Sequence, residues 1–99
     1  MLKNKSLNGL VENYYLSYDF NKLRDETKAQ YKYFMGVMLE TVVQDKPLKL
    51  WKFKNITTGV AREAYEMWSK RGIYMANHVM SCSRVVYSHA MNFDYCEVN

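Results

Sequence analysis

"GIYMANHVMSCSRVVYSHAMNF", residues 72–93, is the stretch that decides the fold, because it has the apolar rhythm of one long helix. At about 100° per residue, one side of this helix is predicted to be buried. Its members are Ala76, Val79, Ser83, Val86, Tyr87 and Ala90. The opposite side carries Asn77, Ser81, Arg84 and Ser88. The outer surface of this helix is therefore small and polar.

Three further helices are predicted upstream. The first begins near Ser6 as N-cap and buries Leu7, Leu10, Val11, Tyr14 and Tyr15 before "SYDFNK" ends it. The second runs from about Arg24 to Val43, with Asp25 and Glu26 in its first turn, and buries Thr27, Tyr31, Phe34, Met35, Met38 and Val42. The third opens at Thr57, buries Val60, Ala64, Met67 and Trp68, and ends at Gly72 in a left-handed conformation. Between the second and third, "QDKPLKLWKFKN" is predicted to be a loop whose aromatic residues cover the edge of the core.

Length and composition indicate one folded domain spanning residues 1–99. The chain has 99 residues, of which 48% are hydrophobic, enough apolar surface to exclude a disordered chain. No apolar run is long enough to span a bilayer and no signal peptide is apparent, so we expect no membrane association and a cytoplasmic location in a bacterial or phage-infected cell. Cys82 and Cys96 are interpreted as reduced, small hydrophobic residues.

The polar side of the last helix lacks acidic residues. From Met67 to Phe93 there is no Asp or Glu, and the chain has a net charge of +4. A surface that faces phosphates excludes carboxylates for Coulombic reasons, and short polar side chains allow a close approach to a groove. The alternative is a solvated face that happens to be poor in acids, and the stripe alone leaves both readings open.

Several motifs occur in an order that resembles the core-binding domain of phage-type tyrosine recombinases, or integrases. They are Thr27-x-x-x-Tyr31, Ile56-Thr57 before a helix with Ala64-Tyr65-x-x-Trp68, Gly72-x-x-x-Ala76-Asn77, Arg84-Val85-Val86-Tyr87-x-x-Ala90, and Val98-Asn99. The resemblance spans about Leu7 to Asn99. The chain departs from the family in "LKLWKFK", which is longer and more aromatic than the usual link.

The resemblance implies an all-α, SAM-like bundle of four helices that clamps double-stranded DNA. A catalytic domain of the same polypeptide is then expected beyond Asn99, with a possible oligomer on DNA. The predicted DNA contacts lie on the second and fourth helices and in the lysine-bearing loop. They are Thr27, Lys28, Gln30, Asn77, Ser81, Arg84, Ser88 and Lys54.

No catalytic or metal-binding residues are predicted. Recombinase chemistry in this family needs an Arg, a His-x-x-Arg pair and a nucleophilic Tyr, and no His-x-x-Arg occurs here. His78, Cys82 and His89 share a flank of the last helix but lack the spacing of zinc ligands, and no glycine-rich phosphate loop is present, so no cofactor is expected.

Two other functions fit the pattern less well. In a helix-turn-helix regulator, the last two helices and Gly72 would form the DNA-binding motif, although the last helix is longer than a usual recognition helix. In a helical protein-interaction domain, Trp51 and Phe53 would form an exposed apolar patch. Burial of these two aromatic residues would count against the second alternative.

Overall fold

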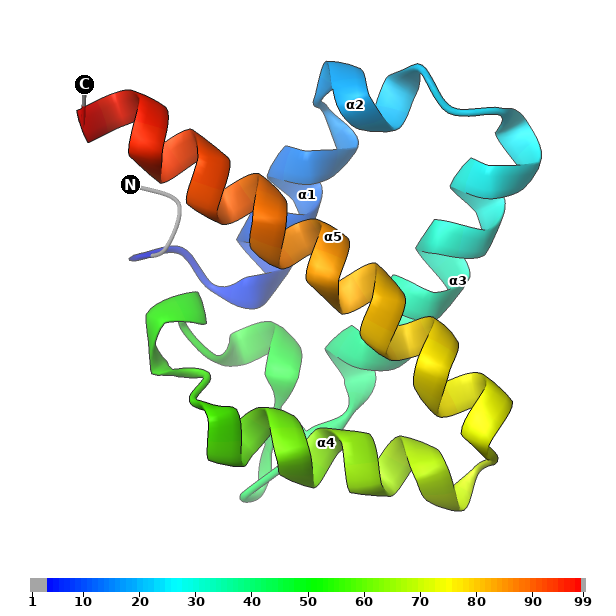
Figure 1. Ribbon diagram of the computed structural model, residues 1–99. Coiled ribbons are helices and arrows are strands. Elements are labelled where there is room, and N and C mark those ends of the chain that lie inside the picture. Colours follow the sequence, from blue (N-terminus) through cyan, green and yellow to red (C-terminus); the bar gives the residue numbers. More distant parts are fainter. Residues whose placement is uncertain (1–3, 99) are drawn as a thin grey trace.

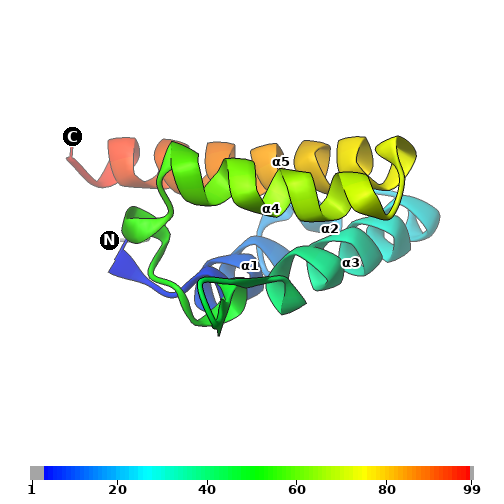
Figure 2. The same cartoon turned by 90° about the horizontal axis from the view of Figure 1, so that it is seen from below.

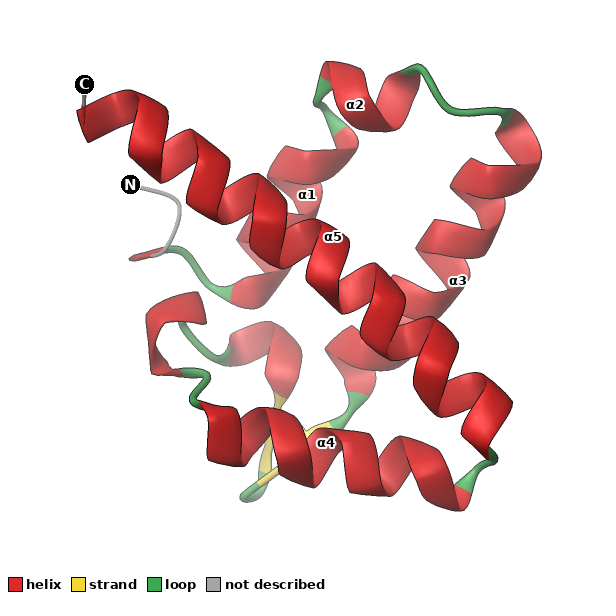
Figure 3. Ribbon diagram, viewed as in Figure 1, coloured by secondary structure: helices red, strands yellow, loops and turns green. Residues whose placement is uncertain are grey.

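The stretch after Gly72 forms a single helix, α5 (Ile73–Val98), in the computed structural model, which describes the backbone of residues 4–98 and the side chains of residues 4–92. The all-α class is confirmed, and Figure 3 shows the small amount of strand. The remaining elements are α1 (Leu7–Tyr15), α2 (Tyr18–Asn21), α3 (Asp25–Glu40), β1 (Val42–Val43), β2 (Lys46–Pro47), the 3₁₀ helices η2 (Leu48–Leu50) and η3 (Phe53–Asn55), and α4 (Thr58–Lys70).

The helices form a flat, two-layered molecule of 40 × 31 × 16 Å. Figure 2 shows α4 and α5 side by side in one layer, with α1 and α3 beneath them. Figure 1 looks onto the first layer, where α5 crosses the whole molecule in front of α1 and α3. Since α5 lies on a broad face, the side of α5 that points away from the second layer is exposed at Asn77, Ser81, Arg84 and Ser88.

Local sequence signals fix the ends of the helices. The Ser6 Oγ accepts a hydrogen bond from the backbone N–H of Gly9 at 3.1 Å, and the Thr57 Oγ1 accepts one from Val60 at 3.3 Å. Both N-caps predicted from the sequence are confirmed. Gly72, with φ of +126°, makes the turn between α4 and α5, a conformation that a residue with a Cβ rarely adopts.

The core lies between the two layers. The α5 residues in it were predicted from the helical period, and Ala76, Val79, Val86 and Ala90 are at most 1% exposed. The upper layer adds Cys82 from α5, with Val60, Ala64 and Trp68 from α4. The lower layer and the linking segment contribute Leu7, Leu10, Val11, Tyr14, Phe20, Phe34, Met35, Met38, Val43 and Leu48.

Two residues predicted to be buried, one on α5 and one on α4, are exposed instead. Tyr87 is 55% exposed and its ring lies 5.7 Å from that of Phe53, while Met67 is 39% exposed. Tyr87 lies about 80° around α5 from Val79, at the margin of the buried arc. The apolar stripe read from the sequence was therefore too wide at its edges.

The second predicted helix is shorter than expected, because α3 ends at Glu40 instead of Val43. The next residues form a tight hairpin in which Gln44 and Asp45 have positive φ angles of 53° and 66°. Val42, predicted to be buried in the helix, lies in β1 and is 49% exposed. The predicted loop after this point contains η2 and η3.

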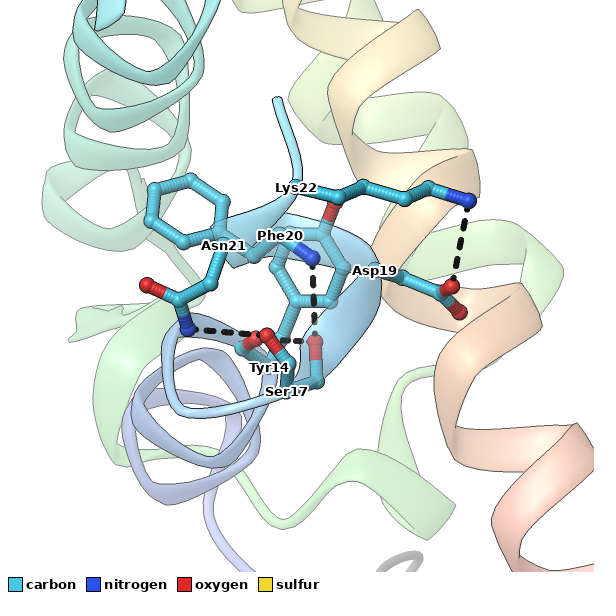
Figure 4. A network of polar contacts seen from close by, with 6 residues as sticks. All are labelled: Tyr14, Ser17, Asp19, Phe20, Asn21 and Lys22. Carbon is cyan, nitrogen blue, oxygen red and sulfur yellow. Dashed lines mark hydrogen bonds and ion pairs between the residues drawn. The ribbon is translucent and has the colours of Figure 1, made fainter. Parts of the chain in front are cut away.

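The segment "SYDFNK" follows the end of α1, as predicted, but it also contains the short helix α2, which was not predicted. Figure 4 shows the polar contacts that hold this corner, in which the Ser17 Oγ donates to the carbonyl of Tyr14 at 2.6 Å. The same oxygen accepts from the backbone N–H of Phe20 at 3.3 Å, and the Asn21 amide donates to the Ser17 carbonyl at 2.8 Å. The corner buries Phe20 beneath α1, where its ring meets that of Tyr14 at 5.4 Å.

Candidate nucleic-acid interface

The outer face of α5, which we define as Asn77, Ser81, Arg84 and Ser88, is exposed at all four positions. The hydroxyl of Tyr65 on α4 donates a hydrogen bond to the Asn77 Oδ1 at 3.1 Å. This bond leaves the amide group of Asn77 with its two N–H donors available to a ligand. The four residues lie in the order and on the side that the sequence predicted.

Gln30 of α3 lies beside this face. A hollow of about 130 Å³ between α3 and α5 is lined by Gln30 and Ser81 together with Phe34 and His78. The imidazole of His78 stacks on the Phe34 ring, with centroids 4.9 Å apart and an interplanar angle of 17°. The two helices are thus packed through aromatic contacts, with the polar side chains of Gln30 and Ser81 at the surface.

Arg84 carries the positive charge at the centre of the outer face. Within the described residues no carboxylate pairs with it, and the ion pairs there join Lys22 to Asp19 and Lys49 to Glu40. Asp19 lines a shallow hollow with Arg84 and Ser88, so one acidic residue from α2 borders this face. The Lys22 ammonium, 3.5 Å from the Asp19 carboxylate, partly offsets that negative charge.

Polar groups that the prediction had considered for chemistry are instead part of the packing. Burial raises the pKa of the Cys82 thiol to about 11, so it stays protonated at neutral pH. His89 lies against the Tyr14 ring, and its Nε2 is 2.8 Å from the Asn13 Oδ1. Burial lowers the pKa of His89, and the charge of Asp19 opposes that shift. These groups support the α1–α5 contact.

Lys54 lies on the other flank of α5, where it lines a groove together with Arg84. Two other lysines of this segment have partners within the protein. The Lys49 ammonium is 3.0 Å from a Glu40 carboxylate oxygen, and the Lys46 ammonium lies 4.7 Å from the centre of the Trp51 ring. The segment therefore offers Lys54 and Lys52 as its exposed cations without a partner among the described residues.

The aromatic residues of the same segment are half-buried. Trp51 and Phe53 pack against the core, and the Trp51 indole N–H donates to the carbonyl of Lys46 at 3.1 Å. They do not form the exposed patch that the protein-interaction alternative required of them. That alternative is weakened in the form in which the sequence suggested it.

Thr27 and Lys28 are not brought to the outer face of α5. Thr27 is half-buried, and the Lys28 ammonium lies 5.9 Å from the Phe20 ring centroid, on the side of α3 that meets α2. Lys28 and Gln30 are about 200° apart around α3, so they cannot point the same way. The structure groups Gln30 with α5 and leaves Lys28 next to α2.

Tyr74 is a surface residue that the sequence reading missed. Its side chain is 71% exposed and its ring centroid lies 4.2 Å from that of His78. Tyr74 precedes Asn77 by three positions and Ser81 by seven, the spacing of residues on one helix face. This spacing was present in the sequence, but Tyr74 was not included among the predicted site residues.

Two further observations concern metal-binding clusters and membrane-spanning helices. Among the described residues, no group of three or more His, Cys, Asp or Glu side chains could hold a metal ion. None of the helices in that part of the chain combines the length and apolar character needed to cross a membrane. The side chains of Phe93 and Cys96 lie outside the described residues.

Comparisons with family models, with curated proteins and with solved structures find no match to this chain.

Proposed function

We propose that this chain binds double-stranded DNA through the outer face of α5. The observation that carries the proposal is a helix surface of Asn77, Ser81, Arg84 and Ser88 that is exposed throughout, while α5 has no carboxylate between Ile73 and Asn92. An exposed surface on a single-domain protein ordinarily mixes both signs of charge. A helix that lies against phosphates has a physical reason to exclude acids, since each one would repel the backbone of the duplex.

The dimensions of the face suit the major groove. From Asn77 to Ser88 the helix rises about 16 Å, and the major groove of B-DNA is about 12 Å wide and admits an α-helix. Ser and Asn are short, so the helix axis can approach the base edges. In this arrangement Arg84 contacts guanine or phosphate, and Gln30 beside Ser81 is placed to pair with adenine.

The flat shape of the molecule favours the same arrangement. With a thickness of 16 Å and α5 on a broad face, the protein can lie along a duplex without steric conflict from the other layer. Lys54 and Lys52 on one flank can reach the phosphates beside the groove. Lys28, next to α2, contacts DNA only if the duplex extends past that corner of the molecule.

Within this proposal, the protein is the DNA-binding module of a site-specific tyrosine recombinase with a SAM-like bundle. The resemblance of its motifs to integrase core-binding domains, and the packing of α4 and α5 around Gly72, support that assignment. The module clamps the recombination-site duplex in the cytoplasm for DNA integration and recombination. A catalytic domain of the same polypeptide supplies the chemistry, and several copies assemble on the site.

The proposal is tested by comparing Arg84→Ala with Arg62→Ala, a matched loss of charge from an exposed position on α4. Binding of a short mixed-sequence duplex is measured by fluorescence anisotropy at several salt concentrations. If roughly three to five phosphates are neutralised, log K falls against log salt with a slope of about −3 to −4.5. Arg84→Ala should make this slope shallower by about 0.9, and Arg62→Ala should leave it unchanged. Equal effects of the two substitutions, or binding without salt dependence, would reject the proposal.

A further inference from the structure

A groove of about 520 Å³ opens between α4, η3 and α5, on the flank of α5 that faces α4. Its floor consists of core side chains from both layers, among them Leu7, Met38 and Trp68. Its rim on α5 consists of Met80, Tyr87 and Met91. Figure 1 shows α4 and α5 diverging from the short turn that joins them. Both helices contribute residues to the lining of the groove.

The size and lining of this groove suit a ligand or a partner. Pockets of about 300–1,000 Å³ with an apolar lining are typical binding sites. Tyr87 is 55% exposed and Met91 is 44% exposed, so the rim leaves apolar surface in contact with water. Exposed apolar surface of this kind is unfavourable in water and often marks a site where a partner binds.

The shape of the rim favours an elongated occupant. Met80, Tyr87 and Met91 are spaced by seven and four positions and so follow one line along α5 for about 16 Å. This length equals about three turns of a docked helix. Methionine side chains adapt to the shape of a partner, and grooves that accept amphipathic helices often use them.

The charge around the groove restricts the occupant further. The charged residues that line it are Lys54 on η3 and Arg84 on α5, and both are cationic and exposed. Among the described residues, no carboxylate lines the groove. A complementary partner therefore presents apolar side chains to the floor and acidic side chains to the rim.

We propose that this groove is a docking site for an amphipathic helix of a partner protein, with an apolar face and acidic flanks. The apolar face covers Met80, Tyr87 and Met91, and the acidic flanks meet Lys54 and Arg84. The proposal goes beyond DNA binding and does not depend on it. Arg84 and Lys54 border both surfaces, but the apolar rim of Met80, Tyr87 and Met91 is not part of the outer face of α5. It also gives a role to the exposed apolar rim, which DNA binding through the outer face of α5 does not use.

The test uses two synthetic helical peptides that share a leucine stripe at positions i, i+3, i+4 and i+7. One has glutamate on both flanks of the stripe and the other has lysine. Binding is measured by calorimetry with the folded protein. The glutamate peptide should bind roughly tenfold more tightly than the lysine peptide. No binding of either peptide, or equal binding of both, would overturn the proposal.

Substitutions in the protein locate the peptide. Lys54→Glu should weaken binding of the glutamate peptide and strengthen binding of the lysine peptide, an exchange that a folding defect cannot produce. Lys46→Glu is the matched control, because this lysine is in the same segment but lies over the Trp51 ring and outside the groove. If Lys46→Glu has the same effect as Lys54→Glu, the peptide responds to the net charge of the protein and not to the groove, and the docking site is rejected.

Two more variants separate this proposal from DNA binding. Tyr87→Ser removes an apolar group from the rim and should lower the affinity for the glutamate peptide several-fold, while the affinity for the duplex stays unchanged. Ser81→Asp places a carboxylate on the outer face of α5 and should lower the affinity for the duplex, while the affinity for the peptide stays unchanged. Loss of peptide binding in Ser81→Asp, or none in Tyr87→Ser, would contradict the groove. A dimer in sedimentation that Tyr87→Ser abolishes would also contradict it, since a second copy would then fill the groove.

Discussion

The buried and exposed valines of this chain give a sharp test of where the core lies. Val86 on α5 is 1% exposed, whereas Val42 in the hairpin is 49% exposed, and both can be replaced by the same residue, alanine. Val86→Ala removes two methyl-sized groups from the core, at about 0.8 kcal/mol each, and leaves a small cavity that costs about 1 kcal/mol more. The expected loss of stability is therefore about 2–3 kcal/mol. Val42→Ala should cost less than about 0.5 kcal/mol.

These values translate into a large difference in melting temperature. For a domain of this size, 1 kcal/mol corresponds to about 4–8 °C, so Val86→Ala should melt roughly 10–20 °C below the unsubstituted protein. Urea unfolding followed by circular dichroism should show a lower midpoint with an unchanged slope. Equal losses in Val86→Ala and Val42→Ala, or a loss below about 1 kcal/mol in Val86→Ala, would refute the placement of α5 over the core.

Three further predictions follow from local contacts. Thr57→Ala removes the N-cap of α4 and should lower the free energy of unfolding by about 1 kcal/mol, measured by thermal unfolding. Thr58→Ala, at the next position, should cost much less, and equal losses in the two variants would show that the capping hydrogen bond is not formed. The Cys82 thiol should resist iodoacetamide in mildly alkaline buffer, because burial raises its pKa to about 11, and rapid alkylation of the folded protein in a Cys96→Ser background would contradict this burial. Burial lowers the pKa of His89 below its ordinary 6.5, so the unfolded chain binds the proton more tightly, and the free energy of unfolding should fall as the pH drops below about 6.5. If the His89→Gln protein lost just as much stability over the same pH range, the loss would belong to another titrating group.

The sequence predicted the long helix and both of its sides because its period repeats over many turns. Asn77, Ser81, Arg84 and Ser88 are all exposed, and Val79 opposite them is fully buried. The period gives the angle of a residue around the helix but says nothing of which neighbour covers it. Tyr87, at the margin of the buried arc, was therefore assigned to the wrong side.

Short elements were missed for a different reason. Four residues, the length of α2, are too few to show a helical period. The hairpin depends on positive φ angles at Gln44 and Asp45, and neither residue is the glycine that usually signals such a turn. These elements are set by contacts with the rest of the molecule, such as the hydrogen bond from the Trp68 indole to the Thr41 Oγ1 at 2.8 Å.

The placement of the candidate interface residues could be predicted only in part. The sequence treated Lys28 and Gln30 as members of one surface, but the direction of each side chain depends on how α3 is rotated against its neighbours. Packing of Phe34 against His78 places Gln30 beside Ser81 and turns Lys28 towards Phe20. The groove beside α5 could not be predicted, because it forms where two helices diverge.

The central claim is that the outer face of α5 contacts duplex DNA, and mapping of amide resonances on adding DNA tests it most directly. A short mixed-sequence duplex is titrated into isotopically labelled protein, and the shifts are followed residue by residue at low salt. The account predicts the largest shifts at Asn77, Ser81, Arg84 and Ser88, followed by Gln30 of α3, with little change at the buried Val79. Shifts confined to the hairpin and η2, or centred on Lys28 with the outer face of α5 unchanged, would contradict it.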